Sequence, residues 1–106
     1  METAASTEEK IHAKKDIDYA FMFNGFTLVV MSNGSHEVVD LSLSRIEGML
    51  KSRCFFRIHR SYLVNMKRVK EMVVRDNKLM IRIRGQELPV SRRKRKILLK
   101  MLPTVN

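Results

Sequence analysis

Four tight-turn signals divide this chain into short apolar runs and constrain its fold more than any other feature. They lie at Asn24-Gly25, at residues 32–35 (Ser-Asn-Gly-Ser), at Asp76-Asn77 and at Gly85-Gln86. Asn24-Gly25 is the strongest, because both residues tolerate the positive φ angles of a two-residue hairpin turn. The runs between the turns alternate in polarity or are rich in β-branched and aromatic residues. The turns therefore predict antiparallel strands joined by hairpins.

The expected strands are residues 16–23, 26–31, 36–39, 55–58, 62–64, 69–75, 78–84 and 87–90, with a further short strand at 11–13. Tight turns join the strands at 16–23, 26–31 and 36–39 in succession, which predicts a meander. Apolar residues at every second position from Ile17 to Phe23 predict one strongly apolar face. Pro89 indicates that the last strand is a sheet edge or very short.

Two segments have the hydrophobic period of a helix instead. The first is short and central, with an apolar face formed by Leu43, Ile46, Met49 and Leu50. Its N-cap is Ser44, in a capping box with Glu47, or else Asp40 or Ser42, and residues 51–53 close it. The second is C-terminal: Ser91 caps it and Pro103 stops it. The apolar side of this second helix consists of Ile97, Leu98, Met101 and Leu102.

Two stretches place arginines directly after a strand. Residues 55–65 read Phe-Phe-Arg-Ile-His-Arg-Ser-Tyr-Leu-Val-Asn, so that His59, Arg60 and Ser61 form a polar corner between two strands. An exposed cationic corner on a rigid scaffold suits contact with an anion. Residues 88–96 read Leu-Pro-Val-Ser-Arg-Arg-Lys-Arg-Lys, which puts cations in the first turn of a helix, where the macrodipole favours anions. Cations at a position that the helix dipole disfavours indicate a functional role rather than a stabilising one. A helix N-terminus with added arginines attracts phosphate.

The positive charge is concentrated in the half of the chain that contains these two arginine-bearing stretches. The formal net charge is +10. Residues 1–50 hold four Lys or Arg against eight Asp or Glu, whereas residues 51–106 hold 17 against three. Self-repulsion of that size needs a polyanion or solvent to screen it. Nucleic acid is therefore the leading partner on composition, with a membrane surface or an acidic protein next.

Length and composition limit the other possibilities. A chain of 106 residues with 44% hydrophobic residues predicts one folded domain. No apolar run approaches the roughly 20 residues of a membrane helix. The lone Cys54 excludes an internal disulfide and a cysteine zinc pair, and residues 1–10, expected to be a disordered leader, lack the apolar centre of a signal peptide. We expect a cytoplasmic protein.

No catalytic or metal site is expected. His59 and Ser61 are close in sequence, but no nearby acidic residue could orient the imidazole as a catalytic triad requires. The sequence contains neither a His/Cys/Asp cluster with metal-ligand spacing nor a glycine-rich phosphate loop. We therefore predict no enzyme activity, no metal and no cofactor.

The motif at residues 55–65, with Leu-Pro-Val-Ser-Arg-Arg further along, closely resembles the LytTR DNA-binding domain family. Asp16-Ile17-x-Tyr19 and Leu43-x-x-Ile46 support the resemblance, which covers about residues 11–102. It implies a mainly β, elongated domain of small antiparallel sheets with one short central helix and a C-terminal helix. It also implies sequence-specific binding of double-stranded DNA at tandem promoter repeats by a bacterial two-component response regulator, with loops in successive major grooves. A receiver or sensor domain and pairing of domains on the repeats are implied as partners.

The resemblance also implies site residues. Arg92 and Arg60 fall on positions that read bases in the family. The third base-reading position falls near residues 24–27, and Asn24 is the candidate there. Arg93 is a further candidate for base reading beside Arg92. The candidate phosphate-binding residues are His59, Ser61, Arg57, Lys67, Arg68, Lys94 and Arg95. His59 has the alternative role of bracing the corner through the backbone, and Ser61 that of a turn former.

Two other classes of function remain open. One is an RNA-binding or ribosome-associated protein, which usually interleaves exposed aromatic residues with cations. The seven Phe and Tyr residues of this chain fall largely at positions in phase with the core, which argues against that class. The other is a protein-interaction module that docks on an acidic partner.

Overall fold

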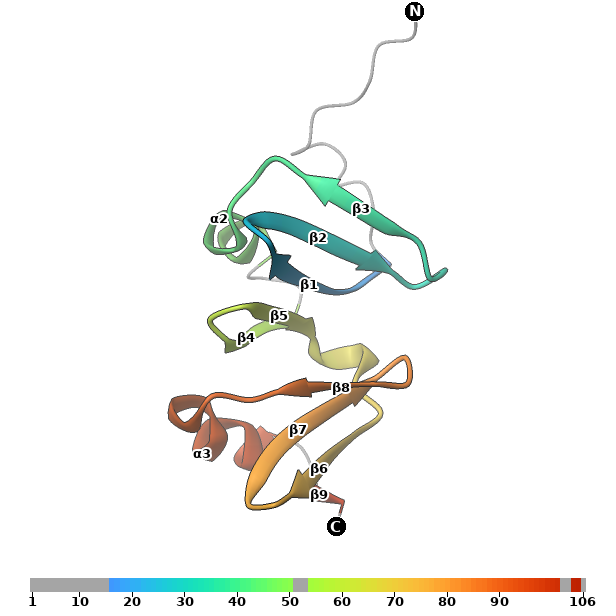
Figure 1. Ribbon diagram of the computed structural model, residues 1–106. Coiled ribbons are helices and arrows are strands. Elements are labelled where there is room, and N and C mark those ends of the chain that lie inside the picture. The colour runs from blue at the N-terminus through green and yellow to red at the C-terminus, as the bar shows by residue number, and fades with distance from the viewer. Residues whose placement is uncertain (1–15, 51–53, 102–103, 106) are drawn as a thin grey trace, which may run out of the picture.

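The computed structural model describes residues 16–50, 54–101 and 104–105. The predicted leader at 1–10, the strand at 11–13, the helix end at 51–53, and the apolar Leu102 and helix stop at Pro103 lie outside these ranges. Figure 1 shows two sheets stacked along one long axis, and the molecule measures 52 × 24 × 24 Å. The predicted elongated shape is confirmed.

The first sheet has the strand order β3-β2-β1-β5-β4, with every neighbouring pair antiparallel. Its strands are β1 (Ile17–Phe23), β2 (Phe26–Met31), β3 (His36–Val39), β4 (Phe55–His59) and β5 (Tyr62–Asn65). The first three form the predicted meander, because the Asn24-Gly25 and 32–35 turns join them. Two further strands, β5 and then β4, extend the sheet beyond β1, so the motif at residues 55–65 forms part of the same sheet.

The second sheet has the order β8-β7-β6-β9. It consists of β6 (Glu71–Arg75), β7 (Lys78–Ile83), β8 (Gln86–Pro89) and β9 (Thr104–Val105). The predicted strands at residues 69–75, 78–84 and 87–90 are confirmed within two residues at each end. The β9 strand was not anticipated, and it pairs with β6 in parallel, the one parallel pair within the described residues.

Two α-helices and a 3-10 turn complete the described part of the chain. The central helix α2 (Leu43–Met49) is capped by Ser42, whose hydroxyl accepts the N–H of Arg45 over 3.1 Å. Of the three predicted caps, Ser42 is therefore the correct one. The 3-10 turn η2 (Met66–Arg68) follows β5, and α3 (Arg92–Met101) follows β8. No helix in the described ranges is long and apolar enough to cross a membrane.

The first sheet has an apolar core on each of its faces. Helix α2 covers one face, where Leu43, Ile46 and Leu63 are buried. The second sheet and α3 cover the other, where Ile58, Ile81 and Leu98 are fully buried. Each strand of the first sheet except its edges therefore buries residues on both sides, which fixes its register firmly.

The prediction of one continuous apolar face along β1 is wrong. The register of β1 and β2 shifts between Ile17 and Tyr19, which is a β-bulge at Asp18. Because a bulge reverses the side to which later residues point, Ile17 packs in the core under α2 and Tyr19 packs in the core against the second sheet. Phe23, at the far end of the strand, is 60% exposed.

Candidate nucleic-acid interface

Three segments from distant parts of the sequence lie along one edge of the molecule, which we call the loop edge. It consists of the β1–β2 turn at Asn24-Gly25, the β4–β5 turn at Arg60-Ser61, and the start of α3 at Arg92, and all three lie on the left in Figure 1. Backbone hydrogen bonds connect them. The N–H of Met22 donates to the Ser61 carbonyl over 3.1 Å, and the N–H of Ser91 donates to the Ile58 carbonyl over 2.8 Å.

A bulge in β4 makes the second of these bonds possible. The register of β4 and β5 shifts between Arg57 and His59, so Ile58 has no partner in the ladder. A bulged residue leaves its backbone groups available to other segments. The Ile58 carbonyl accepts the N–H of Ser91, and this contact places the start of α3 beside the β4–β5 turn.

The side chain of Arg57 stabilises the β4–β5 turn by hydrogen bonds to its backbone carbonyls. Its Nε donates to the His59 carbonyl over 3.0 Å, and its Nη2 donates to the Arg60 carbonyl. Its Nη1 pairs with Glu47 of α2 over 3.0 Å, and the side chain is only 17% exposed. The predicted phosphate-binding role of Arg57 therefore competes with internal contacts, which orient it toward the protein. The sequence predicted Glu47 as part of a capping box and gave no sign of this ion pair, because α2 and β4 meet only through the tertiary fold.

His59 braces the same turn. Its Nδ1 accepts the N–H of Ser61 over 3.0 Å, and its ring meets the edge of Tyr62 with 5.7 Å between ring centroids. Since Nδ1 is the acceptor, the neutral ring carries its proton on Nε2, which remains a donor. This geometry fits the bracing alternative for His59 and the turn-forming alternative for Ser61, and it leaves their phosphate roles as predictions.

Three arginines on the loop edge have guanidinium groups that are free to contact a ligand. Arg60, Arg92 and Arg93 are exposed, and within the described residues none of their side chains makes a hydrogen bond or ion pair. The first turn of α3 contains no acidic residue. Unpaired cations at a helix N-terminus produce a strongly positive local field. The edge is therefore suited to a polyanion.

The two following cations of α3 are partly engaged within the protein. Lys94 lies over the Phe56 ring, with its Nζ 5.2 Å from the centroid. Arg95 donates to the Asn77 carbonyl of the β6–β7 turn over 2.9 Å. Both are half-buried, so their predicted phosphate contacts would use the remaining donors of each side chain.

The β1–β2 turn offers a different surface. Asn24 and Gly25 have φ angles of 50° and 81°, the positive values that a two-residue hairpin needs. Asn24 is exposed, and the flanking Phe23 and Phe26 are 60% and 61% exposed. The expectation that the aromatic residues lie largely in phase with the core fails for these two. The predicted alternation in β1 places Phe23 on the same face as Phe21, and Phe26 lies opposite Phe23 in β2, but the core ends before these strands do.

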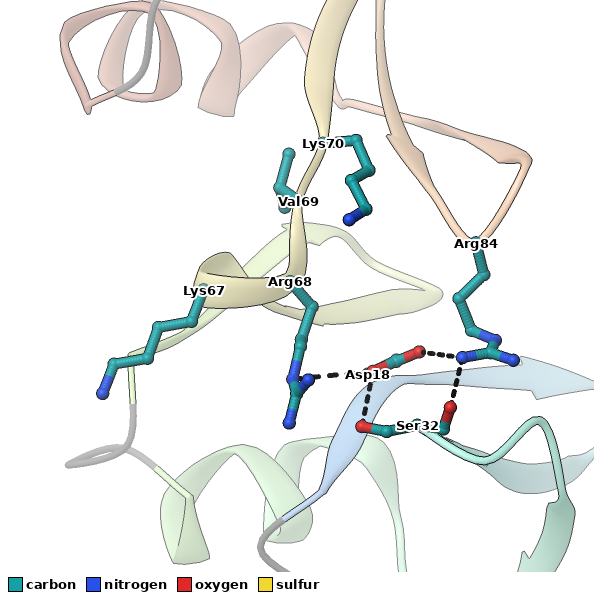
Figure 2. Close-up of a pocket in the computed structure, with 7 residues that line it drawn as sticks. All are labelled: Asp18, Ser32, Lys67, Arg68, Val69, Lys70 and Arg84. Carbon is teal, nitrogen blue, oxygen red and sulfur yellow. Dashed lines mark hydrogen bonds and ion pairs between the residues drawn. The ribbon is translucent and has the colours of Figure 1, made fainter.

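Lys67 and Arg68 lie away from the loop edge. They belong to η2, at the opposite end of β5 from the β4–β5 turn. There they line a pocket of about 450 Å³ with Asp18, Ser32, Val69, Lys70 and Arg84, shown in Figure 2. Since a strand advances about 3.3 Å per residue, β5 separates the two groups by more than 10 Å.

The pocket contains an ion-pair network between the two sheets that the sequence did not suggest. Arg84, from the β7–β8 turn, donates to the buried carboxylate of Asp18 over 3.1 Å and to the carbonyl of Ser32. Arg68 approaches the other oxygen of Asp18 at 3.8 Å. The network joins the two sheets, as Figure 2 shows, and the β7–β8 turn that carries Arg84 lies on the right in Figure 1, opposite to the loop edge.

The match to a family model decides the family. Residues 10–103 match the model of the LytTr DNA-binding domain. The chain belongs to the LytTR family. A transcriptional regulatory protein LytR from Staphylococcus aureus strain N315 is 36% identical over 67 residues, which cover 61% of this chain and 27% of that protein. The corresponding protein of strain NCTC 8325 has the same values. This LytTR chain thus spans about a quarter of the length of the curated relatives it matches.

A solved structure has the same fold. The LytTr DNA-binding domain of a Bacillus cereus protein superimposes with a TM-score of 0.72 at 23% sequence identity, covering 83% of this chain and 82% of that one. At this identity the likeness concerns the fold alone. It confirms the predicted LytTR architecture of mainly antiparallel sheets with two helices.

Proposed function

We propose that this LytTR domain binds duplex DNA sequence-specifically through the loop edge, as the DNA-binding part of a bacterial transcriptional regulator. The observation that carries the proposal is the pair of backbone hydrogen bonds that joins the three segments of that edge. A rigid edge with several protruding turns can present side chains to base edges in the grooves.

Arg60, Arg92 and Arg93 are the proposed base readers. Their guanidinium groups are exposed and unpaired within the described residues, so binding breaks no internal ion pair. Arginine recognises guanine through two parallel hydrogen bonds in the major groove, each such contact discriminating by about 1–3 kcal/mol. Asn24 is a further proposed reader from the β1–β2 turn.

Phosphate contacts would set the register of the protein on the duplex. His59 Nε2, Ser61, Lys94 and Arg95 surround the proposed readers and remain candidates for this role. Arg57 acts in this proposal by holding the turn that carries Arg60. Lys67 and Arg68 have no part in it, because they lie at the opposite end of β5.

The length of the molecule fits the proposed use of repeated sites. Its long axis of 52 Å exceeds one turn of B-DNA, which is about 34 Å. We propose that two domains bind in tandem on repeated elements, and that a receiver or sensor domain supplies the input. The curated relatives are transcriptional regulatory proteins much longer than this chain, which supports the second point.

Selection of bound sequences from random duplex DNA tests the proposed function. We expect enrichment of a short element that contains guanines and recurs in tandem. Competition with single-stranded RNA belongs in the same experiment, because the exposed Phe23 and Phe26 remove one argument against an RNA partner. Enrichment of no element, or stronger binding of single-stranded RNA, would overturn the proposal.

A further inference from the structure

The tip of the β1–β2 hairpin is apolar and projects beyond the sheet. Strand β5 pairs with β1 only from Tyr19 to Phe21, and Met22 donates one further backbone bond to Ser61, so among the described residues the hairpin has no strand partner on that side beyond Met22. Phe23 and Phe26 face each other directly across the hairpin and are 60% and 61% exposed. Opposed residues in an antiparallel pair point to the same face with their Cβ atoms about 5 Å apart. The two rings therefore form one exposed apolar surface.

This surface is continuous with the rest of the loop edge. Phe21 lies on the same face of β1, two residues before Phe23, and stacks on Tyr62 with 6.0 Å between centroids. Tyr62 in turn meets the ring of His59 in the β4–β5 turn. Rings thus lead from the hairpin tip to the corner that carries Arg60. A hairpin on such a packed base is rigid, so its tip is held in a fixed position relative to the arginines.

We propose that Phe23 and Phe26 recognise the C5-methyl groups of thymine in the major groove, so that this corner of the loop edge selects A·T base pairs. The inference rests on the proposed DNA binding and adds the chemistry that one of the three corners reads. The thymine methyl is the apolar group of the major-groove edge, and phenylalanine is among the side chains that contact it.

The composition of the hairpin tip favours this role over polar readout. Between Phe23 and Phe26 only Asn24 carries a side-chain hydrogen-bonding group, and no cation is present. The neighbouring corners carry exposed Arg60 and Arg92, so a surface that meets all three must combine anionic and apolar groups. The major groove of a duplex, with phosphates beside thymine methyls, has both.

Deoxyuridine substitution tests the proposal, because it removes the methyl group and preserves base pairing. The probe is the duplex selected from the random library, with each thymine replaced in turn by deoxyuridine. For the unaltered protein we expect affinity to fall about fourfold at one or a few thymines, the effect of one buried methyl group. Replacing guanines by 7-deazaguanine serves as the control for arginine readout on the same duplex.

The variant Phe23→Ala/Phe26→Ala should bind the selected duplex more weakly and show no further loss at those deoxyuridines. It should retain the response of the parent protein to 7-deazaguanine. Both rings are largely exposed, so the variant should fold, which its circular dichroism and thermal midpoint verify. Val38→Ala is the matched control: it removes an exposed apolar side chain, 65% exposed, from β3, and should leave affinity unchanged.

Two results would overturn the inference while leaving DNA binding intact. One is a parent protein whose affinity changes at no deoxyuridine. The other is a double variant that still loses affinity at the same deoxyuridines as the parent protein. Failure of the parent protein to select any duplex is a different result, which would overturn the proposed function and this inference together.

Discussion

The backbone N–H of Ser91 donates to the carbonyl oxygen of Ile58 across 2.8 Å, and this bond joins the two arginine-bearing segments of the chain. Ser91 immediately precedes Arg92, and Ile58 lies two residues before Arg60. The carbonyl is available because Ile58 is bulged out of the β4–β5 ladder. This hydrogen bond thus brings two motifs that are distant in the sequence next to each other on one surface.

Replacing Arg57 should weaken DNA binding although its side chain faces the protein. Arg57→Met removes the donors to the His59 and Arg60 carbonyls, and we expect affinity for the selected duplex to fall about tenfold, comparable to the loss of one net hydrogen bond. Fluorescence anisotropy measures the change. Arg57→Lys separates the two possible roles, since lysine retains the charge but cannot reach both carbonyls. If Lys restores affinity, Arg57 acts as a phosphate contact.

Arg92→Ala should cost about 1–3 kcal/mol on the selected duplex and reduce discrimination among bases at the position that it reads. The measurement is a set of binding isotherms on duplexes with single base changes. Arg75→Ala is the matched control, because Arg75 is an exposed arginine in the second sheet, paired with Glu87. An equal loss on selected and random DNA would reassign Arg92 to a phosphate contact.

The affinity should depend strongly on salt. With about six phosphate contacts, the logarithm of the association constant should fall with the logarithm of salt concentration at a slope of about −5. Titrations at several potassium chloride concentrations give the slope. A slope near zero would mean that counterion release does not drive binding, which contradicts an interface built on exposed arginines.

Leu98→Ala should destabilise the domain by about 2–5 kcal/mol. Leu98 of α3 is fully buried in the core that lies between the two sheets, so truncation leaves a cavity there. Its neighbour Leu99 is 39% exposed, and Leu99→Ala should cost about 1 kcal/mol or less. Urea denaturation of both variants gives the comparison, and equal losses would contradict the assigned orientation of α3.

The local elements could be predicted from the sequence because local signals determine them. Asn24-Gly25 marks a hairpin turn by backbone preference alone, and the spacing of Leu43, Ile46 and Leu50 indicates a helix by its period. The position of the arginine corners after strand ends was likewise visible in the motif. These features need no knowledge of which strands become neighbours.

The features that sequence reasoning missed all depend on tertiary neighbours. Asp18 sits at a bulge and receives Arg84 from the other sheet, an encounter between residues far apart in sequence. The exposure of Phe23 follows from the short pairing of β5 with β1, which strand alternation cannot indicate. Lys67 and Arg68 were predicted to bind phosphate on the same face as the corner, whereas β5 leads them to the opposite end of the sheet.

Amide chemical-shift mapping during titration with the selected duplex tests the loop edge most directly. We expect the largest perturbations at Asn24, Arg60 and Arg92 together, and small ones at Ser32 and Arg84 at the opposite end of the sheets. Perturbations centred on Ser32 and Arg84, with Arg60 and Arg92 unchanged, would contradict the proposed interface.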